Sequence, residues 1–111
     1  MTETRFNIDA YLQEISRYEL LSEEEEQEIL KAVQAKGVGS VEMKRIEEAC
    51  ARFVVSVANQ YKNRGASLER LIAAGTEGVR RAALDYDTAG HSKFLKLAVE
   101  YMRQEMQKIA Y

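Results

Sequence analysis

Residues 41–63 read VEMKRIEEACARFVVSVANQYKN, and this stretch decides the fold class of the 111-residue chain. Its apolar side chains follow one another at steps of four, three, one, three and four residues, the spacing of one face of an α-helix. Ser40 stands at the N-cap position before the stretch. We therefore predict one long amphipathic helix here, with a face made of Ile46, Cys50, Phe53, Val54, Val57 and Tyr61.

Four further helices are predicted on the two sides of this stretch. Asn7 stands at an N-cap position before the first of them, and Ser67 before the third. Ser22 and Glu25 form the pattern of a capping box at the start of the second. We expect these helices at about residues 8–16, from 22 to about 37–39, at about 68–85, and from about 92 to the end.

Two glycines, Gly75 and Gly78, lie one turn apart inside the helix expected at 68–85. Because a glycine inside a helix costs about 1 kcal/mol relative to alanine, we expect the pair to allow another helix to come close. No segment alternates with a period of two residues, so no strand is predicted, and the fold class is all-α, a compact domain of about five helices. The pattern predicts a core of Leu12, Ile15, Ile29, Val33, Ile46, Phe53, Val54, Val57, Leu71, Ile72, Val79, Ala83, Phe94, Ala98 and Met102.

The composition excludes several classes of protein. The chain has no proline, no tryptophan and six glycines, which argues against sandwiches and barrels. One cysteine, Cys50, rules out an internal disulfide, and a single histidine, His91, is too few for a usual zinc site. We expect His91 to be a surface residue in a turn. No apolar run of about 18 residues and no signal-peptide core is present, so we expect a cytoplasmic protein that does not enter a membrane.

The sequence offers no persuasive active site. The four consecutive glutamates at 23–26 point in different directions on a helix, which favours a solvated first turn over a metal site. Cys50 lies on the apolar face of the long helix, which favours a buried, inert thiol over a nucleophile. We therefore expect a protein that is not an enzyme and that needs neither a metal nor another cofactor.

The charges are distributed unevenly along the chain. Residues 1–35 hold nine acids and three bases, a net charge of −6, and residues 36–111 hold thirteen bases and nine acids, a net charge of +4. An acidic segment before a basic body is a weak indication of nucleic-acid binding. Two unrelated solvated faces would produce the same numbers.

Residues 93–104, KFLKLAVEYMRQ, are the most informative segment for function. Basic, aromatic and amide side chains alternate along this one helix, which is a pattern that holds phosphates while rings stack on exposed bases. Phe94 and Tyr101 are also seven residues apart, the spacing of a core face. Periodicity alone favours the core interpretation of these two rings.

Six stretches resemble the bacterial sigma-70 family of RNA polymerase initiation factors, and they occur in the family's order from about Ile8 to the end. The resemblance covers the segment before region two and region two itself. It implies an all-helical fold of the sigma region-two type. In that arrangement an acidic helical segment at residues 1–39 packs on a region-two-like body at 40–111. The stretches are YLQEI at 11–15, LLSEEE at 20–25, ARFVVSVA at 51–58, YKNRG at 61–65, Leu71-Ile72 with Gly75 and Gly78, and Lys93-Phe94 with Arg103-Gln104.

What the resemblance implies about function is specific. Family members bind a coiled coil of the largest subunit of core RNA polymerase and capture flipped bases of the upstream promoter hexamer on the last helix of region two. By this resemblance Lys93 would hold a phosphate, Phe94 and Tyr101 would pack or stack, and Tyr86 would wall a base pocket. Gln104 would face a base edge with support from Arg103. Lys62 and Arg64 match basic positions after the long helix.

Several positions depart from the family pattern. An aromatic run becomes Leu97-Ala-Val-Glu100-Tyr101, and Glu100 places a negative charge toward DNA. In the polymerase-binding stretch, an acid becomes Arg70, and an amide and an acid become Ala73 and Ala74. The expected function is a transcription-initiation module that binds core polymerase and promoter DNA. The alternative is a degenerate relative that keeps the fold, no longer opens promoters, and pairs with an anti-sigma-type protein or with itself.

Overall fold

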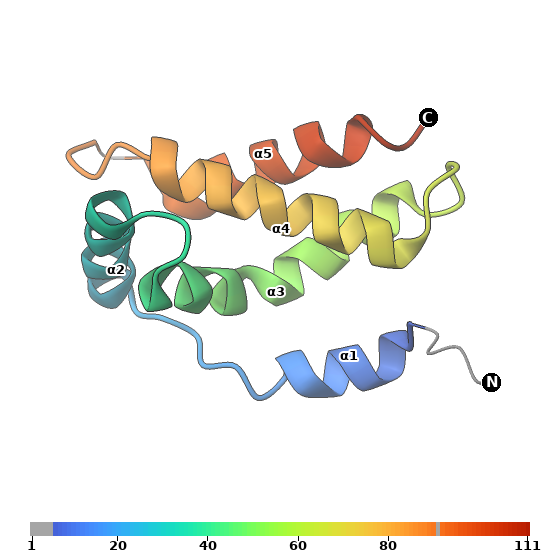
Figure 1. Ribbon diagram of the computed structural model, residues 1–111, viewed down its shortest axis with the longest axis horizontal. Coiled ribbons are helices and arrows are strands. Elements are labelled where there is room, and N and C mark those ends of the chain that lie inside the picture. Colours follow the sequence, from blue (N-terminus) through green and yellow to red (C-terminus); the bar gives the residue numbers. More distant parts are fainter. Residues whose placement is uncertain (1–5, 91) are drawn as a thin grey trace.

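A computed structural model describes residues 6–90 and 92–111, and residues 1–5 and His91 lie outside the described part. The described residues form five helices and no strand, which confirms the predicted all-α class. Each helix begins and ends within about two residues of its predicted limits, except that the last one stops at Gln107 before the end of the chain. The helices are α1 (Ile8–Ile15), α2 (Glu23–Lys36), α3 (Val41–Tyr61), α4 (Leu68–Asp85) and α5 (Phe94–Gln107) (Figure 1).

Side-chain caps explain where four of these helices begin. The Asn7 side chain accepts hydrogen bonds from two backbone amides of α1, and the hydroxyls of Ser40 and Ser67 each accept one from α3 and α4. The capping box at α2 is complete, because the Ser22 hydroxyl accepts from the Glu25 amide at 3.2 Å and the Glu25 carboxylate accepts from the Ser22 amide at 3.1 Å. The N-cap of α5, Lys93, makes no such bond, so tertiary packing sets the start of that helix.

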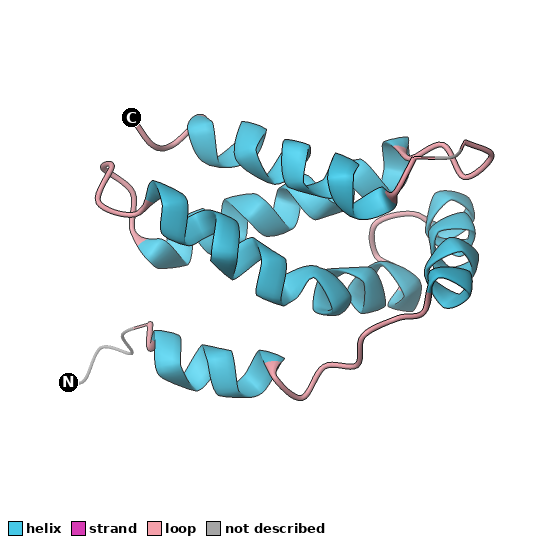
Figure 2. Ribbon diagram, turned by 180° about the vertical axis from the view of Figure 1, so that it is seen from behind, coloured by secondary structure: helices cyan, strands magenta, loops and turns pink. Residues whose placement is uncertain are grey.

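The helices α3, α4 and α5 form the body of the molecule. They pack against one another along their lengths, and α2 stands across one end of this body, where it contacts α3 and α4 (Figure 1). The first helix lies along α3 on the side away from α5, and Figure 2 shows the connector that leads from its end to α2. None of the helices in residues 6–90 and 92–111 combines the length and apolar composition needed to cross a membrane.

The core fills the space between α2, α3, α4 and α5, and it contains most of the residues that the pattern predicted. Two predicted core residues are wrong, because Leu12 and Phe53 are each 41% exposed. Leu12 is exposed because α1 packs on α3 alone and buries only Ile15. Phe53 lies beside the connector between α1 and α2, where it lines a cavity together with Leu20 instead of meeting another helix.

Gly78 brings α4 and α5 into backbone contact. A Cβ at Gly78 would lie 2.6 Å from the carbonyl oxygen of Tyr101 and 2.7 Å from the amide nitrogen of Met102. A Cβ at Gly75 would lie 2.5 Å from the terminal methyl of Met106. The predicted close approach of a second helix at this pair is confirmed, and it presses the middle of α5 against α4.

Two glutamine side chains attach α2 to the end of α4. The Gln34 amide donates to the backbone carbonyls of Ala83 at 3.1 Å and Tyr86 at 2.6 Å. The Gln27 amide lies 3.3 Å from the Tyr86 hydroxyl. The acidic helix is therefore held beside the loop that leads from α4 into α5.

Candidate nucleic-acid interface

Phe94, at the start of α5, is a packing residue. Its side chain is only 1% exposed, and its ring meets the ring of Tyr86 edge to face, with 5.5 Å between centroids and 84° between planes. The resemblance left packing and stacking open for Phe94, and the burial of the ring agrees with packing. A ring in this position anchors the α5 N-terminus to the α4–α5 loop.

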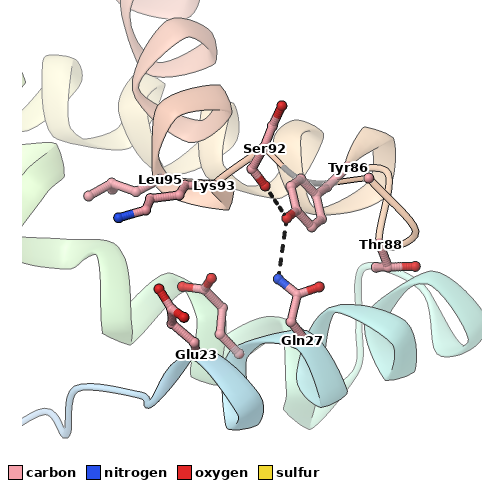
Figure 3. A pocket seen from close by; sticks show the side chains of 9 residues that line it. Glu23, Gln27, Tyr86, Thr88, Ser92, Lys93 and Leu95 are labelled. Carbon is pink, nitrogen blue, oxygen red and sulfur yellow. Dashed lines mark hydrogen bonds between the residues drawn. The ribbon is translucent and has the colours of Figure 1, made fainter.

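Tyr86 separates the core from a cavity of about 560 Å³ at the start of α2. Its hydroxyl donates to the backbone carbonyl of Ser92 and accepts from the Gln27 amide, as Figure 3 shows. Lys93 extends over the opposite side of this cavity from Glu23 (Figure 3). The cavity is lined by Glu23, Glu26, Gln27, Tyr86, Thr88, Gly90, Ser92, Lys93 and Leu95.

The residues that α2 contributes to this cavity were missed by sequence reasoning. Glu23 and Glu26 were interpreted as a solvated first turn, yet both line the cavity beside Tyr86. Burial raises the pKa of the Glu26 carboxyl above its usual value, with a further rise from the charge of Glu23. No signal in the sequence pointed to this meeting, because these glutamates lie about 60 residues before the loop that they face.

A second cavity of about 420 Å³ lies on the other side of the same loop. Tyr86 and Lys93 line it as well, so one aromatic wall and one ammonium group serve both cavities. Three carboxylates and two ammonium groups line the second cavity, so it offers partners for both cationic and anionic groups. Its lining is Asp85, Tyr86, Asp87, Gly90, Ser92, Lys93, Lys96, Leu97 and Glu100.

Tyr101 is half-buried on α5 and lies against α4. Its hydroxyl donates to a carboxylate oxygen of Asp85 at 2.8 Å, and the guanidinium carbon of Arg81 lies 4.9 Å from the ring centroid. Arg81 also forms an ion pair with Glu105. The hydrogen bond to Asp85 raises the pKa of the Tyr101 hydroxyl above its usual value, since the carboxylate disfavours the phenolate.

The remaining predicted contacts lie toward the other end of α5. Arg103 donates to the Gln60 side-chain carbonyl at 2.6 Å, and Gln104 is exposed. Lys62 and Arg64 are exposed at the end of α3, where the Arg64 guanidinium lies 5.5 Å from the Tyr61 ring centroid. At about 1.5 Å per residue, Arg103 is about 15 Å along the helix from Lys93.

The altered residues of the expected polymerase face lie on α4. Arg70 and Ala73 are exposed and Ala74 is half-buried. Within residues 6–90 and 92–111, Arg70 forms no ion pair, whereas Arg80, further along α4, pairs with Glu47 and Glu77, each at 3.0 Å. The described side chains also contain no group of three or more His, Cys, Asp or Glu that could hold a metal ion.

Comparisons of the sequence with known proteins find sigma factors. Residues 7–36 match the family model for sigma-70 factor, region 1.2. The chain is 36% identical over 99 residues to the RNA polymerase sigma factor SigA of Lactococcus lactis subsp. cremoris, covering 88% of this chain and 27% of that protein. The SigA of Listeria monocytogenes is also 36% identical over 99 residues, with 88% and 26% covered. The chain thus spans about a quarter of the length of the curated relatives that it matches, and these matches support a fragment of the sigma-70 family.

Proposed function

We propose that this chain is a transcription-initiation module that binds core RNA polymerase and the non-template strand of promoter DNA at the upstream hexamer. The relatives are RNA polymerase sigma factors, and this supports the general role. The observation that carries the DNA-binding part is the shared wall of the two cavities, where Tyr86 offers an aromatic edge and Lys93 a positive charge. We expect the module to work in the bacterial cytoplasm and to need no enzyme activity of its own.

On the DNA side, we propose that the strand crosses the start of α5. The two cavities have volumes of about 560 and 420 Å³, within the range of about 300–1,000 Å³ that is typical of ligand pockets. A base extruded from the stack enters such a pocket while its phosphate meets a cation outside it. Lys93 is exposed at the rim of both cavities and fits the phosphate contact.

Further along α5, we propose that the strand meets the exposed amide of Gln104 at a base edge, while Arg103 supports the surface through its hydrogen bond to Gln60. Lys62 and Arg64, exposed at the end of α3, extend the positive charge beyond this point. Near the second cavity, the carboxylates of Asp85 and Glu100 reduce this positive charge and repel the phosphates of the strand. We therefore expect weak binding that weakens further as salt is added.

On the polymerase side, we propose that the outer face of α4 meets the coiled coil of the largest polymerase subunit. Arg70 and Ala73 are exposed there, and the two residues between them, Leu71 and Ile72, are buried. An exposed arginine in an interface adds affinity only where the partner offers an acid, and a like charge opposite it costs several kcal/mol. Because Arg70 stands where the family has an acid, we expect it to weaken polymerase binding.

Fluorescence anisotropy with a labelled AT-rich single strand of the non-template hexamer, at low salt, tests the DNA-binding part. We expect Lys93→Ala to weaken binding and to reduce the salt dependence by about one released counterion. The matched control is Lys44→Ala, which removes an equally exposed ammonium group from the start of α3. Absence of binding at high micromolar protein, or equal losses in both variants, would contradict the proposal.

Capture of purified core polymerase tests the partner. We expect the wild-type chain to be captured weakly and Arg70→Asp to be captured more strongly, because an aspartate restores the acid of the family pattern at this position. Capture of the wild-type chain without any binding of the DNA strand would indicate a regulator that binds polymerase and does not open promoters. Lack of capture would contradict the polymerase-binding part.

A further inference from the structure

We propose that Arg81 and Glu105 form a latch that holds the Tyr101 ring closed against α4, and that an unpaired base stacks on the face covered by Arg81 only when the latch opens. The inference rests on the DNA-binding part of the proposed function and adds a control on it. In this inference Arg81 is a positioning residue. It acts on the strand through Tyr101, because it competes with a base for the same face of that ring.

Contacts at two places hold the Tyr101 side chain. The Arg81 guanidinium lies over the ring, 4.9 Å from the centroid, in the geometry of a cation–π pair. The hydroxyl at the far end of the ring donates to Asp85 at 2.8 Å. A base that stacks on the covered face must take the place of the guanidinium, because one ring face holds one planar partner.

Glu105 keeps Arg81 in this position. The Glu105 carboxylate pairs with Arg81 from one side and with Lys108, at 2.9 Å, from the other, and its side chain is only 13% exposed. The two cations hold the pKa of the Glu105 carboxyl below its usual value, so it stays charged and keeps its hold near neutral pH. Arg81 is thus fixed over Tyr101 by a partner that belongs to the same helix as the ring.

The backbones of α4 and α5 are already in contact at Tyr101. Because the carbonyl of Tyr101 lies 2.6 Å from where a Cβ of Gly78 would be, the two helices meet at this residue and cannot slide together further. Release of the ring must therefore come from side-chain rotation, with Arg81 moving away first. This is a change that a bound strand or a single substitution can produce without unfolding the domain.

The alternative is that Arg81 itself contacts a phosphate, and it predicts the opposite change in DNA affinity when Arg81 is removed. Loss of a cation that binds phosphate weakens DNA binding, whereas loss of a latch strengthens it. The double variant Arg81→Gln/Glu105→Gln removes one positive and one negative charge, so the net charge is unchanged. The matched control is Glu77→Gln/Arg80→Gln, which removes the ion pairs of Arg80 with Glu77 and Glu47 without touching Tyr101 and also leaves the net charge unchanged.

We expect the latch variant to bind the AT-rich single strand about threefold to tenfold more tightly than wild type, the range that a cation–π contact and a partly exposed ion pair provide. The control variant should bind as wild type does. Adding Tyr101→Leu to the latch variant should abolish the gain, because the gain passes through that ring. Circular dichroism confirms that each variant is folded.

A second readout follows the ring without DNA. With 3-fluorotyrosine in place of the six tyrosines, the Tyr101 fluorine resonance is assigned by its loss in Tyr101→Phe. The latch variant should shift this resonance and the control should not. Equal or weaker binding of the strand by the latch variant, while wild type binds, would overturn the latch and leave the proposed function standing. If neither wild type nor the latch variant binds the strand, the proposed DNA-binding function is wrong. The latch then controls no DNA binding, and it is wrong as well, even if the fluorine resonance shifts.

Discussion

The rings of Tyr86 and Phe94 meet edge to face across the turn that joins α4 to α5, with their centroids 5.5 Å apart. Phe94 points into the core, and Tyr86 sends its hydroxyl to Ser92 and Gln27 at the cavity beside α2. One pair of rings therefore connects the hydrophobic core to the candidate binding surface. Damage to the core at this point is expected to reach the site as well.

Replacement of Phe94 by alanine should destabilise the fold by about 3–5 kcal/mol, because it removes a fully buried ring and leaves a cavity. Urea unfolding followed by circular dichroism measures the change. Phe53→Ala is the matched control, since the same ring is lost from a position that is 41% exposed. Equal losses at the two positions would show that Phe94 is not part of the core in solution.

Gly78→Ala should destabilise the protein by about 2 kcal/mol or more. The added methyl group would meet the backbone of Tyr101 and Met102 at 2.6–2.7 Å, and backbone atoms cannot rotate away, so the cost of overpacking exceeds the gain in helix propensity. Gly39→Ala serves as the comparison, because a methyl group there meets nothing within 4 Å. Thermal unfolding of both variants decides the point, and a stabilised Gly78→Ala would show that α4 and α5 are further apart.

The capping box should make stability depend on pH through Glu25. Its hydrogen bonds with Ser22 lower the pKa of the Glu25 carboxyl below its usual value. A carboxyl with a depressed pKa in the folded state stabilises that state above its unfolded pKa, and the contribution is lost as pH falls through the folded value. Wild type should therefore lose its advantage over Glu25→Gln between about pH 5 and pH 3.

Thermal unfolding across this pH range, for wild type and Glu25→Gln side by side, checks the capping-box prediction. Glu24→Gln is the control, because it removes a neighbouring carboxylate that accepts no hydrogen bond among the described residues. An advantage that persists unchanged to pH 3 would mean that Glu25 does not cap α2 in solution.

Cys50 should be unreactive in the folded protein. Its side chain is 5% exposed, and burial raises the pKa of the thiol to about 12, so the nucleophilic thiolate is scarce at neutral pH. Reaction with a chromogenic disulfide reagent should be slow in buffer and immediate in denaturing urea. Fast reaction under native conditions would show that the connector between α1 and α2 opens readily over the cavity that Cys50 lines.

The helix positions were predictable because their signals are local. The serines at 22, 40 and 67 cap helices within three residues of themselves, and the apolar spacing of α3 needs only the 3.6-residue period. The same period gave a wrong prediction at Phe53. Periodicity identifies the apolar face of a helix, but it does not indicate whether another helix covers every part of that face. Leu12 failed for the same reason, since α1 has one helical neighbour.

The amino-acid sequence by itself determined the all-helical class, the five helices and most of the core, because propensity, capping and periodicity act over a few residues. It also carried the family resemblance, through motifs that occur in the family's order. Only the tertiary structure decided that Tyr101 lies under Arg81 and that glutamates of α2 line the cavity beside Tyr86. Those relationships join residues up to about 60 positions apart. They depend on how closely helices approach, which the backbone contact at Gly78 sets and no local pattern encodes.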